Sequence, residues 1–176
     1  KDFKKLEDIR LTYADKWILS RLNNVVKEVT INLNKYEIGL ATGKLYDFVW
    51  SDFCDWYIEA TKPMLYGDNE RAKLNALTVL NFVLDEILKL MHPFIPFVTE
   101  EIYQYKQTGK RHALMMQEWP KYNKKFNYYK EAKAFEGVMD IIKAIRNVRN
   151  EMQVAPSKKI KVYVKAGEHA AVVEKL

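Results

Sequence analysis

The chain has 176 residues, with 29 Lys or Arg against 23 Asp or Glu, so its formal net charge is +6. Its apolar content of 48% and aromatic content of 13% exclude an intrinsically disordered protein. Cys54 alone excludes a disulfide framework, and charged residues interrupt every apolar run well before the roughly 20 residues that span a bilayer. We therefore expect a reduced, cytoplasmic domain outside the membrane, with a weak preference for a polyanionic partner.

Apolar residues recur at intervals of three and four along most of the chain, a pattern that predicts helices. Thr12 and Asp15 have the spacing of a capping box and predict a first helix from about 13 to 33. A second helix is predicted from about 37 to 61, and Pro63 is expected to end it. The residues on its inward side are expected to be Ile38, Leu45, Val49, Phe53, Trp56 and Ala60.

Two further helices are predicted on either side of a turn that contains two prolines. Asp68 or Asn69 caps the earlier helix, Pro93 ends it, and Pro96 starts the later one. The core side of the earlier helix is expected to hold Leu74, Leu77, Leu80 or Leu84, Ile87, Leu88 and Met91. Residues 106 to about 131 then lack periodicity, which is typical of a connection that is either functional or wrapped over the protein surface.

A fifth helix is predicted from about 133 to 152. Its inward residues are expected to be Phe135, Val138, Ile142, Ile145 and Val148. After Pro156, the apolar residues Ile160, Val162 and Val164 alternate with lysines and a tyrosine, which predicts a half-buried strand. A single strand cannot form a sheet, so we expect the natural chain to continue beyond Leu176.

These elements predict an all-α fold, an antiparallel helical bundle followed by the start of a small α+β piece. The bundle is expected to occupy residues 12–154, after a linker over residues 1–11. Residues 155–176 are expected to form a truncated strand–helix subdomain.

Sequence motifs for catalysis are missing. The chain has neither a glycine-rich phosphate loop nor the paired Cys or His residues of a zinc site. Asp52, Asp55 and Glu59 have helical spacing, but they would need ligands from a second segment to hold a divalent cation. No such segment is evident, so we expect no catalytic residue, no metal and no cofactor in this chain.

The outward side of the second predicted helix combines an apolar residue with charges. Asp55, Ile58, Glu59 and Lys62 share this side at positions i, i+3, i+4 and i+7. This combination suits recognition of an unstacked base, since isoleucine can contact the ring, carboxylates can accept from an exocyclic amine, and lysine can meet a phosphate. The alternative is that Ile58 packs beneath another helix, because the middle helices of bundles bury two sides.

Basic residues gather on the fifth predicted helix and after it. Arg146 and Arg149 are three positions apart on that helix. The lysines that could extend a positive surface for nucleic acid are Lys158, Lys159, Lys161, Lys165 and, in the connection, Lys121, Lys124, Lys125 and Lys130. Charge runs of this kind are also common on ordinary solvated surfaces.

Several segments appear in the order of a known family. The most specific are residues 53–59, Phe-Cys-Asp-Trp-Tyr-Ile-Glu, followed by Lys62-Pro63, and residues 91–102 with a His-Pro-Phe turn. Residues 15–22, Glu-Trp-Pro at 118–120, and residues 145–156 follow the same order. Together they resemble the anticodon-binding domain of class I aminoacyl-tRNA synthetases for branched aliphatic amino acids, and the His-Pro-Phe turn is similar to that of the valine-specific members. The resemblance covers about residues 11 to 165.

The resemblance implies a domain that binds the anticodon stem-loop of tRNA. For the valine-specific members, this tRNA is tRNA(Val). A catalytic core elsewhere in the same polypeptide would attach the amino acid, using ATP and Mg²⁺. The HIGH and KMSKS signatures of that core are absent, so the chain alone is expected to be non-catalytic. The full-length enzyme is expected to be a monomer.

In this family, the Asp-Trp-Tyr-[Leu/Ile]-Glu segment faces the anticodon bases, which gives this role to Ile58 and Glu59, while Phe53 and Trp56 stay in the core. The expected tRNA-binding residues are Asp55, Ile58, Glu59, Lys62, Arg146 and Arg149. The alternative function is a basic helical module that binds proteins and no RNA, whose positive surface serves solubility only.

Overall fold

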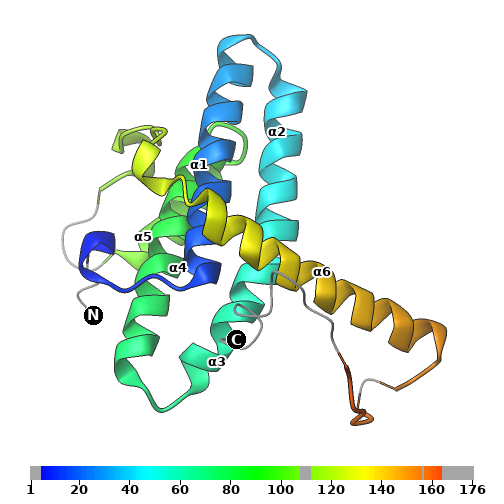
Figure 1. Ribbon diagram of the computed structural model, residues 1–176. Helices are drawn as coiled ribbons and strands as arrows, with labels where there is room; N and C mark the ends of the chain where they lie inside the picture. Colours follow the sequence, from blue (N-terminus) through cyan, green and yellow to red (C-terminus); the bar gives the residue numbers. More distant parts are fainter. Residues whose placement is uncertain (1–4, 108–111, 156, 164–176) are drawn as a thin grey trace.

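The structure is a computed structural model that describes residues 5–107, 112–155 and 157–163. It confirms the all-α class, since no strand occurs within these residues (Figure 1). The α-helices are α1 (Tyr13–Asn34), α2 (Ile38–Asp47), α3 (Glu59–Tyr66), α4 (Glu70–Met91), α5 (Pro96–Lys106) and α6 (Tyr129–Glu151). A π-helix, η2 (Phe48–Ile58), joins α2 to α3, and short 3-10 turns are η1 (Leu6–Asp8), η3 (Leu114–Met116) and η4 (Lys124–Phe126). No helix in the described ranges is long and apolar enough to cross a bilayer.

The first helix, α1, lies at the centre of the bundle and contacts α2, η2, α4 and α6 (Figure 1). The predicted capping box is confirmed, because Asp15 N–H donates to Thr12 Oγ1 at 3.1 Å and Thr12 N–H donates to Asp15 Oδ2 at 2.8 Å. Neighbouring helices cover α1 from several directions, so Trp17 is as deeply buried as Ile18 and Leu22. The centre of the hydrophobic core is therefore built around α1.

The predicted second helix is a longer helical segment made of α2, η2 and α3. The prediction that Pro63 ends it is wrong, since Pro63 lies inside α3 and the helix continues to Tyr66. The predicted inward side is only partly right, because Ile38 is 51% exposed and the unpredicted Tyr57 is fully buried. A π-helix closes its hydrogen bonds over five residues rather than four, so a prediction based on α-helical spacing drifts along η2.

Helix α4 is capped by Asn69, whose side chain accepts a hydrogen bond from Ala72 N–H at 3.0 Å, and it ends before Pro93 as predicted. The predicted core side is partly wrong. Its members Ile87 and Leu88 are buried, whereas Leu74, Leu77, Leu80 and Leu84 are only half-buried. The deepest stripe contains Ala76, Val79, Val83, Ile87 and Leu90. Two adjacent stripes of α4 are apolar, so periodicity alone could not identify the one that enters the core.

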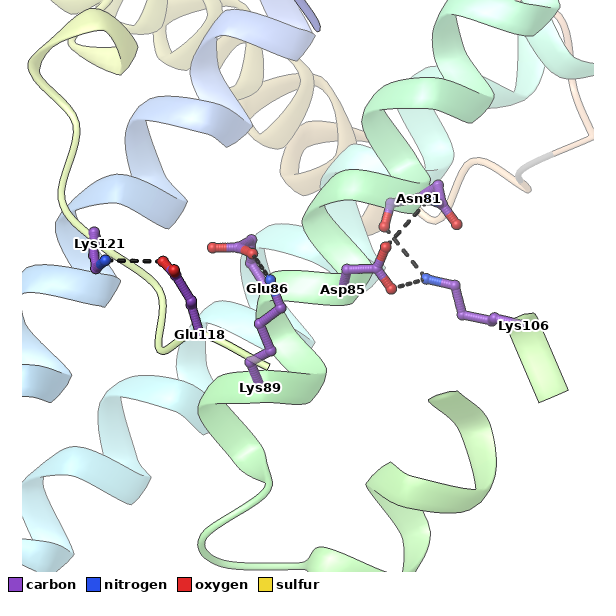
Figure 2. A network of polar contacts seen from close by, with 7 residues as sticks. All are labelled: Asn81, Asp85, Glu86, Lys89, Lys106, Glu118 and Lys121. Carbon is purple, nitrogen blue, oxygen red and sulfur yellow. Dashed lines mark hydrogen bonds and ion pairs between the residues drawn. The ribbon is translucent and has the colours of Figure 1, made fainter. Parts of the chain in front are cut away.

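Polar contacts fasten α5 to α4 (Figure 2). Lys106, the last residue of α5, forms an ion pair with Asp85 on α4. Figure 2 also shows two local ion pairs nearby, Glu86–Lys89 at 2.7 Å and Glu118–Lys121 at 2.9 Å. Of these contacts, the Lys106–Asp85 pair is the one that holds the end of α5 against α4.

The long connection before α6 is wrapped over α1, one of the two predicted possibilities. Asn23 Nδ2 donates to the carbonyl oxygen of Asn123 at 3.0 Å, and Ser20 Oγ donates to the carbonyl oxygen of Phe126 at 2.8 Å. Two buried or half-buried polar side chains of α1 are thereby satisfied by backbone of the connection. The start of α6 is fixed in place by these contacts.

Helix α6 packs most closely on the bundle along its first half (Figure 1). There Phe135, Val138 and Met139 are buried, and the rings of Trp17 and Phe135 are 5.2 Å apart. In the second half Val148 is 53% exposed, so the prediction that it faces the bundle is wrong. The bundle covers this half of α6 less completely, and the side chain of Trp56 contacts it there.

The segment after α6 lies along that second half. Ile145 lines an apolar groove together with Ile160 and Val162, instead of entering the bundle core as predicted. The predicted strand is not formed over residues 160–163, where no described segment supplies a partner for a ladder. Val164 and the rest of the predicted strand–helix piece lie outside the described residues.

Candidate nucleic-acid interface

Four of the predicted RNA-binding residues lie together on η2 and α3, and we call Asp55, Ile58, Glu59 and Lys62 the outer face. Asp55 and Glu59 are exposed, whereas Ile58 and Lys62 are half-buried. Part of the Ile58 side chain packs against the hydrophobic core, as the packing alternative expects, and the rest of it is accessible to solvent. The outer face thus combines two open carboxylates with a partly accessible apolar side chain.

Two members of the outer face bind each other. Lys62 Nζ donates to Glu59 Oε1 at 2.5 Å, and this hydrogen bond raises the pKa of Lys62. Their side chains are 44% and 56% exposed, and ion pairs this exposed to solvent contribute little net stability. A ligand that offers either group a better partner can therefore replace the pair. Asp55 has no hydrogen bond or ion pair within the described part of the chain.

The opposite side of the same segment is anchored to α1 by a buried polar contact. Tyr57 is fully buried, and its hydroxyl donates to Asp15 Oδ1 at 2.6 Å. Burial raises the pKa of Tyr57 well above its ordinary value, and the nearby Asp15 carboxylate adds to the effect. Because Asp15 also belongs to the capping box of α1, this bond fixes the rotation of η2 and turns Asp55 and Glu59 outward.

Asp52 also joins η2 to α1 and is not part of the outer face. Its Oδ2 accepts a hydrogen bond from Arg21 Nε at 2.7 Å. Burial raises the pKa of Asp52, although the Arg21 guanidinium opposes this shift. Among the described residues no group of three His, Cys, Asp or Glu side chains is placed to hold a metal ion. A cation site formed by Asp52, Asp55 and Glu59 therefore has no support in this geometry.

Trp56 brings η2 into contact with the second half of α6. Lys143 Nζ and Arg146 Cζ each lie 5.6 Å from the centroid of the Trp56 ring. Trp56 was predicted to lie in the core alone, but its side chain is only half-buried and contacts two cations. Lys143 was not among the predicted residues, although its position three residues before Arg146 places the two cations on one side of the helix.

The two predicted arginines of α6 have different surroundings. Arg146 is exposed and lies over the ring of Trp56. Trp56 is adjacent in sequence to Asp55 of the outer face. Arg149 donates from Nη2 to the carbonyl oxygens of Ala155 and Lys158, at 2.5 and 3.0 Å. The structure thus brings Arg146 close to η2, while Arg149 holds the turn that follows α6.

Comparison with known proteins gives consistent matches over nearly the whole chain. A family model described as the anticodon-binding domain of tRNA ligase matches residues 15–164. The chain is 49% identical to the valine–tRNA ligase of Clostridium acetobutylicum over 162 residues, which are 92% of this chain and 18% of that protein.

Two more valine–tRNA ligases are similarly related. The protein of Clostridium tetani is 47% identical over 164 residues, 93% of this chain and 18% of the relative. The protein of Bacillus anthracis is 41% identical over 177 residues, 98% of this chain and 20% of the relative. The chain therefore spans about a fifth of the length of these curated relatives. The chain belongs to the family of anticodon-binding domains of tRNA ligases.

Proposed function

We propose that this chain is the anticodon-binding domain of a valine–tRNA ligase. It binds the anticodon stem-loop of tRNA(Val) and positions the tRNA for ATP-dependent aminoacylation by a catalytic core in the same polypeptide. The observation that carries the proposal is the family match over residues 15–164, which is supported by similarity to several valine–tRNA ligases. In the full-length enzyme, ATP and Mg²⁺ would act in that catalytic core.

The chemistry of the outer face fits base edges better than the phosphate backbone. Asp55 and Glu59 repel phosphates, but their carboxylates accept hydrogen bonds from the exocyclic amines of unpaired bases. The apolar part of Ile58 that remains accessible offers a surface to a base ring. Lys62, released from Glu59, is then available to a neighbouring phosphate.

A salt titration separates this proposal from the alternative of a protein-binding scaffold. We would measure the affinity of the full-length enzyme for tRNA(Val) by filter binding over a series of KCl concentrations. RNA binding through phosphates predicts a steep linear fall of log K with log salt, because each neutralised phosphate releases counterions. A weak and flat response would contradict RNA binding and favour the scaffold.

A further inference from the structure

We propose that Lys143 and Arg146 form a binding site for a backbone phosphate of RNA and that Trp56 is the residue that positions them. This inference rests on the proposed function, since the ligand is the backbone of the same tRNA. The two cations lie one turn apart on α6, and both are exposed to solvent. A positive side chain over the indole face is attracted by the ring, which restricts its position without using a hydrogen-bond donor.

The donors of this cation pair are available to a ligand. Arg146 has no ion pair within the described residues, and Lys143 has one long contact, 3.5 Å from its Nζ to Asp140 Oδ1. Arg149, by contrast, already donates to two backbone carbonyls. A guanidinium is planar and carries five donors suited to phosphate oxygens, so Arg146 would make the stronger contact of the pair.

The proposed phosphate site lies beside the outer face, so one RNA strand could contact both. Trp56 directly follows Asp55 and precedes Ile58 and Glu59 within the same turns of η2 and α3. Groups that suit base edges are therefore neighbours of a residue that holds two cations. In protein–nucleic acid complexes, phosphate contacts fix the register while base contacts provide the sequence preference. Trp56 couples the two kinds of contact because it links η2 to α6.

The test compares charge-neutralising variants of the full-length enzyme in the same filter-binding titration. Arg146→Gln and Lys143→Gln should each weaken tRNA(Val) binding roughly three- to tenfold at moderate salt and reduce the salt slope. The double variant, which loses the contact to the one phosphate, should reduce the slope by about 0.7–0.9. Lys133→Gln is the matched control, because it removes the same charge from an exposed position on the packed half of α6. Lys133→Gln should leave the slope unchanged.

The positioning role of Trp56 requires a double-mutant comparison. Trp56→Leu should weaken binding about two- to fivefold in the natural background and have no further effect when both cations are already neutral. Trp56→Phe, which keeps an aromatic ring, should restore most of the loss. An equal effect of Trp56→Leu in both backgrounds would show a packing role only and would overturn the positioning role.

Different results would overturn the phosphate site and the proposed function. A steep salt slope of the natural enzyme that stays unchanged in both Arg146→Gln and Lys143→Gln would overturn the phosphate site alone. A flat response of the natural enzyme would overturn the proposed function, and the phosphate site with it. Both glutamine variants change exposed side chains, so they decide the question even if Trp56→Leu does not fold.

Discussion

The two sides of the helical segment formed by η2 and α3 differ in the burial and pairing of their polar groups. On the inner side Tyr57 is fully buried and its hydroxyl is paired with Asp15. On the outer face Asp55 is unpaired within the described residues, and Glu59 has only an exposed ion pair with Lys62. Buried polar groups must be paired, whereas exposed charges need not be. Stability should therefore depend on the inner side, and RNA selectivity on the outer face.

The largest expected change in stability comes from removing the buried Tyr57 side chain on the inner side. Tyr57→Ala removes a fully buried ring that packs beside Phe53, with ring centroids 6.2 Å apart, and should lower the free energy of unfolding by about 3–5 kcal/mol. Urea denaturation followed by circular dichroism would measure the change. Tyr66→Ala, at an 82% exposed position of α3, is the control and should change stability by less than about 0.5 kcal/mol. Similar losses in both variants would contradict the assignment of the inner side.

A smaller change isolates the buried hydrogen bond. Tyr57→Phe keeps the ring but leaves Asp15 Oδ1 without its donor, so the free energy of unfolding should fall by about 1.5–3 kcal/mol. The same urea titration measures it, with Tyr66→Phe as the control. Unchanged stability of Tyr57→Phe would mean that the Asp15 carboxylate does not depend on the phenol.

The pH dependence of stability sharpens the same comparison. Burial and Asp15 raise the pKa of Tyr57 well above its ordinary value of about 10. Above that pH the unfolded chain loses the phenol proton while the folded chain keeps it, so the folded state binds more protons and stability falls as pH rises. The natural protein should therefore lose up to about 1.4 kcal/mol per pH unit more than Tyr57→Phe does in this alkaline range. If urea titrations gave parallel pH profiles of stability for the natural protein and Tyr57→Phe, they would contradict the raised pKa of Tyr57.

Local signals in the sequence predicted the local structure well. Thr12 with Asp15 defined the start of α1, and Asn69 and Pro96 marked the starts of α4 and α5. Each signal is a contact or a backbone constraint within one turn of helix, so it does not depend on how the helices pack. The exposure of Asp55 and Glu59 was also predictable, because both are charged and lie on one side of a helix.

Tertiary structure decided what the sequence could not show. Tyr57 was missed because the π-helix changes which residues point inward, and no composition signal marks that register. The contact of Trp56 with Arg146 joins residues far apart in sequence, on helices whose mutual placement depends on the whole bundle. Val148 was predicted to face inward because the apolar periodicity of α6 continues into the half that the bundle covers less completely.

The central claim is that the outer face recognises anticodon bases. Its most direct test is aminoacylation by full-length Glu59→Ala, compared for cognate tRNA(Val) and for transcripts changed at one anticodon base at a time. We expect discrimination to fall by about 1–3 kcal/mol at one base, as for the loss of one base-edge contact, while urea denaturation shows unchanged stability. Discrimination equal to that of the natural enzyme at every anticodon base would contradict the role of Glu59 and of the outer face.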